Sequence, residues 1–161
     1  MAIYYATFNA VAVTLAQDVF EITSPASIKV AIRSILLGQF SDAAAADDEL
    51  INIQLIRGFT VTGSGGTTLT PVNRTGIATA SAASSVVKAN NTTLANTGTT
   101  FNPVSDVWNV KAGWVHRPLA EERLILQPST RLVCRMSAPA DVFTANGTLV
   151  FEELGVDPLI S

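Results

Sequence analysis

The sequence predicts an all-β fold, a jelly-roll or Greek-key β-sandwich of about eight to ten strands with long loops. Short runs of β-branched and other apolar residues alternate with the two-residue period of a strand. Gly, Pro, Asn, Ser and Thr separate these runs, as turn residues do. Long polar connections alternate with tight ones, which favours a Greek-key sandwich over a meander barrel.

The first half of the chain is expected to form mostly long strands. Their predicted bounds are Ile3–Leu15, Val19–Ile22, Ile28–Phe40 and Ile51–Phe59. We predict a bend near Asn9 in the first strand, and a turn at Gln17 and Asp18 before the second. Arg57 interrupts the apolar row of the fourth strand, so a bulge or a strand end is expected there.

The second half carries shorter strands and longer loops. The predicted strands are Ser85–Ala89, Val107–Val110 leading to Gly113–Val115, Arg123–Leu126, Arg131–Met136 and Gly147–Glu153. The predicted connections are an acidic loop at Ser41–Glu49, a long loop at Val61–Ser84 with room for one short edge strand, a polar loop at Asn90–Thr100, and a loop or single helical turn at Pro118–Arg123. We expect one domain over residues 1–161, with an extended tail at 153–161.

Composition restricts the classes of partner. The net charge is −3 and no basic stripe is visible, so nucleic-acid binding is not expected. No apolar run approaches the roughly 18 residues that span a bilayer, and Met1–Tyr5 lacks a positively charged leader, so synthesis in the cytoplasm is expected. With 48% apolar and 14% charged residues, either some apolar surface meets a partner chain, or a well-filled core lies under a Thr, Ser and Asn surface.

Candidate chemical sites are weak. The single cysteine, Cys134, alternates onto the same face as Leu132 and Met136, which predicts a buried, unreactive thiol and excludes an intrachain disulfide. His116, the only histidine, lies near carboxylates but has no nucleophile motif beside it. The sequence therefore predicts a protein that is not an enzyme and binds no cofactor.

Three further motifs have structural explanations. The acidic loop with Asp42, Asp47, Asp48 and Glu49 lacks the order of ligands that wraps calcium. The run Gly63–Gly66 resembles a phosphate loop, but no Lys-Ser or Lys-Thr pair follows it. Trp108 and Trp114 are either packed in the core or an interface, or they form a platform for a sugar. No metal site is expected.

Several segments together resemble the jelly-roll head decoration (cement) proteins of tailed bacteriophages, which are encoded beside capsid genes. The segments are Tyr5–Thr14, Phe20–Ala26, Leu55–Thr60 with Gly63–Gly66, Val107–Val110 with Gly113 and Trp114, Pro118 with Glu121–Arg123, and Gly147–Glu153. The resemblance covers most of the chain and consists of scaffold and turn positions, without a catalytic signature.

The resemblance implies a non-enzymatic protein on the capsid surface of a virion, made in the cytoplasm of a bacterial host. Its partners would be the major capsid protein of a phage head and further copies of itself, as a homodimer or homotrimer. The residues assigned to subunit or capsid contacts are Ile3, Tyr4, Tyr5, Gly65, Thr67, Asn91, Thr92, Trp108, Trp114, Pro158 and Leu159.

Two alternatives remain at this point. The chain could belong to another part of the virion, namely the tail, the baseplate or a head fibre. It could instead be a carbohydrate-binding β-sandwich that stacks a sugar on Trp108 or Trp114. Exposure of the two indole rings separates the carbohydrate hypothesis from the structural ones.

Overall fold

The computed structural model describes residues 2–40, 49–76 and 82–155. The strands in chain order are β1 (Ala2–Val13), β2 (Gln17–Thr23), β3 (Lys29–Gln39), β4 (Leu50–Arg57), β5 (Thr67–Leu69), β6 (Val72–Asn73), β7 (Val86–Asn91), β8 (Phe101–Asn109), β9 (Trp114–His116), β10 (Ile125–Leu126), β11 (Arg131–Met136) and β12 (Phe143–Leu154). One short 3-10 helix, η1 (Ala120–Glu122), lies between β9 and β10 and confirms the helical turn predicted at Pro118–Arg123.

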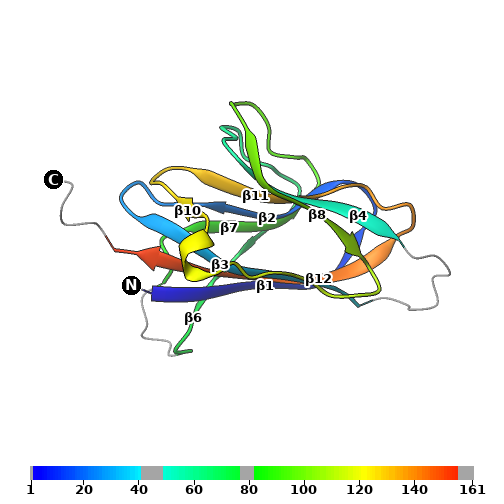
Figure 1. Cartoon of the computed structure of the whole chain (residues 1–161), viewed down its shortest axis with the longest axis horizontal. Coiled ribbons are helices and arrows are strands. Elements are labelled where there is room, and N and C mark those ends of the chain that lie inside the picture. The colour runs from blue at the N-terminus through cyan, green and yellow to red at the C-terminus, as the bar shows by residue number, and fades with distance from the viewer. Residues whose placement is uncertain (1, 41–48, 77–81, 156–161) are drawn as a thin grey trace.

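The strands form two antiparallel sheets that pack face to face (Figure 1). Sheet A has the order β10-β3-β12-β1-β6, with β9 also paired to β3, and sheet B has the order β5-β7-β2-β11-β4-β8. The paths β1-β12-β3-β9 and β2-β11-β4-β8 together have the topology of a jelly roll, in which the chain passes repeatedly from one sheet to the other. The predicted fold class is confirmed.

The hydrophobic core lies between the two sheets because alternate side chains of each strand point inward. Aromatic pairs connect the layers and the strands within them. Tyr4 stacks on Phe151 at 5.5 Å between ring centroids, and Phe8 of sheet A meets Phe20 of sheet B at 5.2 Å. Leu132, Cys134 and Met136 all belong to this core, as their shared parity predicted.

Two irregularities predicted from the sequence occur at the expected places. The register of β1 against β12 shifts between Phe8 and Val11, which is the bend expected near Asn9. Ala10 adopts a positive φ of 53° there, and its N–H donates to Asn146 Oδ1 at 2.7 Å. Arg57 is the last residue of β4, and the pairing with β8 shifts between Leu55 and Arg57.

Other predicted boundaries are wrong. Gln17 and Asp18 are buried residues of β2 instead of a turn, because side-chain partners compensate their polarity. Asn90 and Asn91 belong to β7 instead of a loop, and β8 begins at Phe101 instead of Val107. The described part of Val61–Ser84 holds two short strands instead of one, since β5 extends the edge of sheet B and β6 the edge of sheet A. Most of the acidic loop lies outside the described residues.

Gly147 supplies a test of the packing between β12 and β1. A Cβ atom at this position would lie 2.3 Å from Cε1 of Phe8 and 3.0 Å from Cε2 of Phe20, both on rigid rings. We therefore expect Gly147→Ala to destabilise the fold by about 1–3 kcal/mol through overpacking. Chemical denaturation measures this directly. Gly38→Ala is the matched control, because its Cβ would meet nothing within 4 Å; equal stability of the two variants would contradict the packing described here.

Candidate functional site

The outer face of sheet B is covered by two loop segments that we call the flap, residues 58–66 and 92–100. The two segments are joined by bridges from Val61 to Asn96 and from Ser64 to Thr93, and Figure 1 shows the loops rising above β4 and β8. Val133 and Ile56 are buried although they are not part of the core between the sheets, to which their neighbours Leu132, Cys134 and Leu55 belong. The flap therefore covers the part of this face formed by β2 and β11, whereas outward side chains such as Leu50 of β4 and Val107 of β8 stay exposed.

A buried ion pair fixes one side of the flap to sheet B. Asp18, which is inaccessible to solvent, binds Arg135 with Oδ1 to Nε at 2.6 Å. Its Oδ2 accepts the N–H of Ala95 at 2.7 Å, and the Ala95 carbonyl accepts from Arg135 Nη2 at 2.7 Å. Residues 92–100 are thus tied to the sheet by both main-chain groups of one residue.

A second buried carboxylate fixes the other side. Glu21, with 1% of its surface exposed, accepts the N–H of Gly63 at 2.9 Å and the side-chain amide of Asn91 at 3.0 Å. Thr62 donates its hydroxyl to the same carboxylate at 2.5 Å, and Arg131 pairs with it at 2.8 Å. The contacts with Thr62 and Gly63 join β2 to the flap, whereas those with Asn91 and Arg131 join β2 to β7 and β11. Glu21 and Asp18 are therefore structural anchors that the sequence analysis did not identify.

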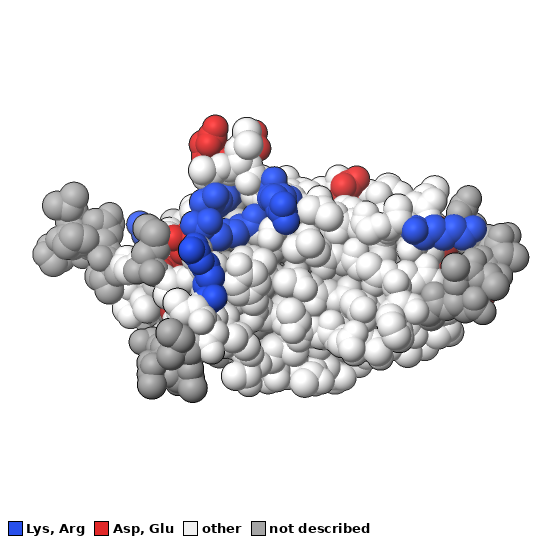
Figure 2. Space-filling view, turned by 90° about the horizontal axis from the view of Figure 1, so that it is seen from below, with Lys and Arg blue, Asp and Glu red and all other residues white. Residues whose placement is uncertain are grey.

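The outer face of sheet A, in contrast, is open. Figure 2 views the molecule from this side and shows Lys and Arg side chains gathered over one part of a face that otherwise carries few charges. They surround a hollow of about 570 Å³, which we call the arginine hollow. Its rim holds Arg33, Arg74, Arg117 and Arg123, and its floor is largely apolar, with Ile3, Tyr5, Leu36 and Val150.

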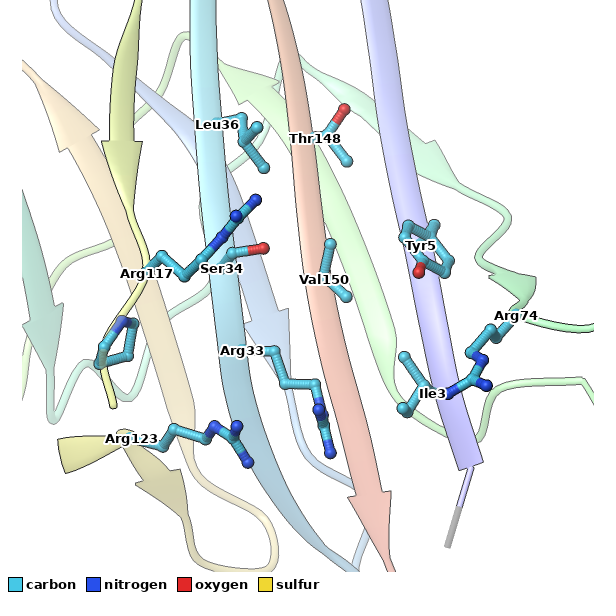
Figure 3. A pocket seen from close by; sticks show the side chains of 11 residues that line it. Ile3, Tyr5, Arg33, Ser34, Leu36, Arg74, Arg117, Arg123, Thr148 and Val150 are labelled. Atoms are coloured by element: carbon cyan, nitrogen blue, oxygen red, sulfur yellow. The ribbon is translucent and has the colours of Figure 1, made fainter. Parts of the chain in front are cut away.

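The four arginines come from different parts of the chain (Figure 3). Arg33 lies on β3 at a register shift and pairs with Glu152 of β12 at 2.5 Å. Arg117 follows β9, and Arg123 follows η1, so both approach β3 from the same side. Arg74 follows β6 and lies beside Ile3, where its N–H donates to the Ile3 carbonyl at 2.9 Å. The cluster therefore forms because folding brings distant segments together, and no run of basic residues in the sequence predicts it.

A second hollow of about 440 Å³ continues the first along the strands. The two share Leu36 and Thr148, and the lining of the second includes Thr7, Asn9 and Asn146. No charged side chain lines this second hollow among the described residues. We call the two hollows together the sheet A groove; it is basic at one end and uncharged at the other.

The predicted contact residues divide between opposite faces. Ile3 and Tyr5 line the arginine hollow, whereas Tyr4 points into the core. Gly65 and Thr92 are neighbours in the flap, since a Cβ on Gly65 would lie 2.3 Å from Thr92 Oγ1. Thr67 lies exposed on the edge strand β5, and buried Asn91 binds Glu21. Pro158 and Leu159 lie outside the described residues.

Both tryptophans are buried side chains of the core. Trp108 is 1% exposed and its Nε1 donates to the Ala112 carbonyl at 2.6 Å. Trp114 is 6% exposed and its Nε1 donates to Asp106 Oδ2 at 3.0 Å, the contact that contributes most to lowering the pKa of Asp106. Neither ring presents an open face, so the two residues do not support the carbohydrate platform and make no surface for another subunit.

His116 and Cys134 have environments that fit structural roles. Burial raises the pKa of the Cys134 thiol, and the negative charge of Asp18 adds to this effect, so the thiolate is strongly disfavoured. His116 stacks on Trp114 with 6.2 Å between ring centroids, and its Nε2 is buried without a hydrogen-bond partner. Burial lowers the pKa of His116 below its ordinary value of 6.5, an effect that Asp106 opposes.

His116 should make stability depend on pH in the mildly acidic range. Its folded-state pKa lies below 6.5, so the unfolded chain takes up the proton more readily. Well above pH 6.5 the imidazole is neutral in both states and has no such effect. As the pH falls through 6.5, protonation of the unfolded chain increasingly favours unfolding. The denaturant midpoint should therefore decrease more between pH 7.5 and pH 5 for the natural chain than for His116→Gln. Parallel decreases in the two proteins would contradict the assignment.

Comparison with protein-family models gives no matching family, and comparisons with curated proteins and with solved structures give no match. Within the described residues, no group of three or more His, Cys, Asp and Glu side chains is placed to hold a metal ion. The same residues contain no helix long and apolar enough to cross a membrane. The sheet A groove, with its cluster of arginines, is therefore the candidate functional site.

Proposed function

We propose that this chain is a non-enzymatic structural protein of a phage virion, a head decoration protein that binds the outer capsid surface and clamps neighbouring capsid subunits. The observation that carries the proposal is the contrast between the two outer faces of the sandwich. Sheet B is covered by its flap over β2 and β11, whereas sheet A presents an open groove with arginines at one end. A protein with one such face is suited to lie flat on a lattice of other subunits.

The rigid sandwich fits this role in energetic terms. A decoration protein stabilises a shell by binding the assembled state and not the separated subunits, so its contribution grows with its concentration and affinity. A face held in shape by paired strands loses little conformational entropy when it binds. Sheet A meets this condition, because β3 and β12 pair along nearly their whole lengths and β1 pairs with β12 beside them.

The resemblance noted above adds the location on the virion and the partner. It implies the major capsid protein as partner and a homodimer or homotrimer as the bound form. Exposed apolar side chains near the free edge of sheet B supply surface for self-association; they include Leu50, Phe101 and Val107, which are 68%, 56% and 55% exposed. Light scattering coupled to size-exclusion chromatography should then show a discrete dimer or trimer.

The test is co-sedimentation of the purified chain with shells assembled from the major capsid protein of the proposed phage. We expect saturable binding to shells and no binding to unassembled capsid subunits, together with greater resistance of decorated shells to heat. A monomer that fails to sediment with the shells would refute the proposal. Electron microscopy of labelled virions distinguishes the head from the alternative positions, since label on the tail, baseplate or fibres would show that the protein belongs to that part of the virion.

A further inference from the structure

We infer that the sheet A groove binds an extended acidic peptide segment of a partner protein, with carboxylates at the arginine hollow and uncharged side chains along the second hollow. This inference names the chemistry of the partner, and it rests on the proposed function for the location of that partner on a capsid. The two ideas are separable, because the groove can be tested with a peptide alone.

The arginines differ in whether they have a partner among the described residues. Outside the hollow, Arg131 and Arg135 pair with Glu21 and Asp18, and Arg57 lies over the Phe101 ring at 5.5 Å. Among the arginines of the hollow, Arg33 alone pairs with a carboxylate of the described residues. Arg74, Arg117 and Arg123 make no ion pair with any described residue, and Arg123 Nε is buried without a hydrogen-bond partner.

The concentration of these groups points to an anion. Like charges gathered in one hollow repel each other, and here they do so in a chain whose net charge is −3. No carboxylate of the described residues lines the hollow. The nearby Glu152 pairs with Arg33 through Oε2, and its Oε1 is buried without a hydrogen-bond partner. The planar guanidinium group binds carboxylates and phosphates through two parallel hydrogen bonds, which makes either anion a suitable ligand.

The shape and floor of the groove favour a carboxylate-bearing peptide over a phosphate chain. A nucleic-acid backbone carries a charge at every step and would need cations along its whole path. The described lining has them only at one end: the floor of the arginine hollow is formed by Ile3, Tyr5, Leu36 and Val150, and the second hollow has no charged side chain. Apolar and polar uncharged side chains of a peptide match these surfaces.

The groove also has the length of a short extended segment. Its lining progresses along β1 from Ile3 to Asn9 and along β3 from Arg33 to Gly38. A strand rises about 3.3 Å per residue, so the path along β1 covers roughly 20 Å. A partner segment of about six extended residues would fill it.

The test measures binding of a short fluorescein-labelled peptide to the full-length chain by fluorescence anisotropy at low salt. The peptide has glutamates in one half and alternating valine and threonine in the other, and a control peptide has glutamine for each glutamate. We expect the acidic peptide to bind, the control peptide to bind at least about tenfold more weakly, and added salt to weaken the binding.

Variants locate the binding to the hollow. Arg117→Gln combined with Arg123→Gln removes two cations that no described residue pairs with, and we expect the Kd for the acidic peptide to rise at least about tenfold. Arg57→Gln is the control for loss of charge elsewhere, since it removes one positive charge outside the groove and should leave the Kd unchanged. Thermal unfolding of each variant checks that the fold is retained.

Three results would overturn the inference. These are absence of peptide binding, an equal Kd for the natural chain and the double variant, and tighter binding of a single-stranded oligonucleotide or of inorganic phosphate than of the peptide. Shell co-sedimentation distinguishes the two proposals. If shells bind the double variant as tightly as the natural chain, the proposed function stands and the groove is not the site of binding. If the chain binds the peptide but not the shells, the groove binds acidic peptides and the proposed function is refuted.

Discussion

Replacing Asp18 by asparagine should destabilise the fold by about 3–5 kcal/mol, the usual effect of removing one member of a buried ion pair. Arg135 would lose its charged partner while 80% of its side chain stays covered, since only 20% is exposed. The Ala95 N–H would at the same time lose an acceptor that is charged. Urea denaturation at neutral pH measures the change in the free energy of unfolding.

The exposed residue Asp141 provides the matched control, since Asp141→Asn should change stability by no more than about 0.5 kcal/mol. A double-mutant cycle with Arg135→Gln isolates the pair, and we expect the double variant to lose less stability than the sum of the single ones. Hydrogen exchange at the Ala95 amide should accelerate in Asp18→Asn, because that amide holds residues 92–100 against the sheet. Unchanged exchange there would show that the flap is fixed by other contacts.

Replacing Trp108 by alanine should destabilise the fold by a similar amount, about 3–5 kcal/mol. The ring is 1% exposed, meets Phe143 edge-on at 5.6 Å, and donates its indole N–H to Ala112. Removal leaves a cavity between the sheets and an unpaired carbonyl. Thermal and urea unfolding both report the loss.

The neighbouring Val107 is the control for this strand, because it is 55% exposed and Val107→Ala should have a small effect. The natural chain should also show blue-shifted tryptophan emission that does not change when sugars are added. Red-shifted emission that responds to sugars would contradict the burial of the two indoles and restore the carbohydrate hypothesis.

Alternation of polarity was sufficient to predict the architecture, because half-buried strands must show it. Ile51, Ile53 and Leu55 illustrate this: each is fully buried on one face of β4. The same rule predicted β11 at its observed bounds, Arg131–Met136. Alternation failed where both faces of a strand are covered. Asp18 and Glu21 face the flap, and burial of a carboxylate cannot be inferred without knowing that an arginine from β11 lies beside it.

The candidate site was predicted only in part, for a similar reason. Ile3 and Tyr5 were expected to contact a partner, and both line the arginine hollow. The arginines themselves were missed, since Arg33, Arg74, Arg117 and Arg123 are far apart in sequence and only strand pairing brings them to one face. A basic stripe is visible in a sequence when its residues lie in one continuous segment, and a cluster assembled from four separate segments gives no such signal.

The central claim is that sheet A, and not the flap over sheet B, faces the partner. Cryo-electron microscopy of shells decorated with the full-length chain tests it most directly. We expect β1, β3 and β12 to lie against the capsid surface, with density from an acidic capsid segment in the sheet A groove and the flap directed outward. Density that places residues 58–66 and 92–100 against the capsid, with the arginines open to solvent, would contradict the account.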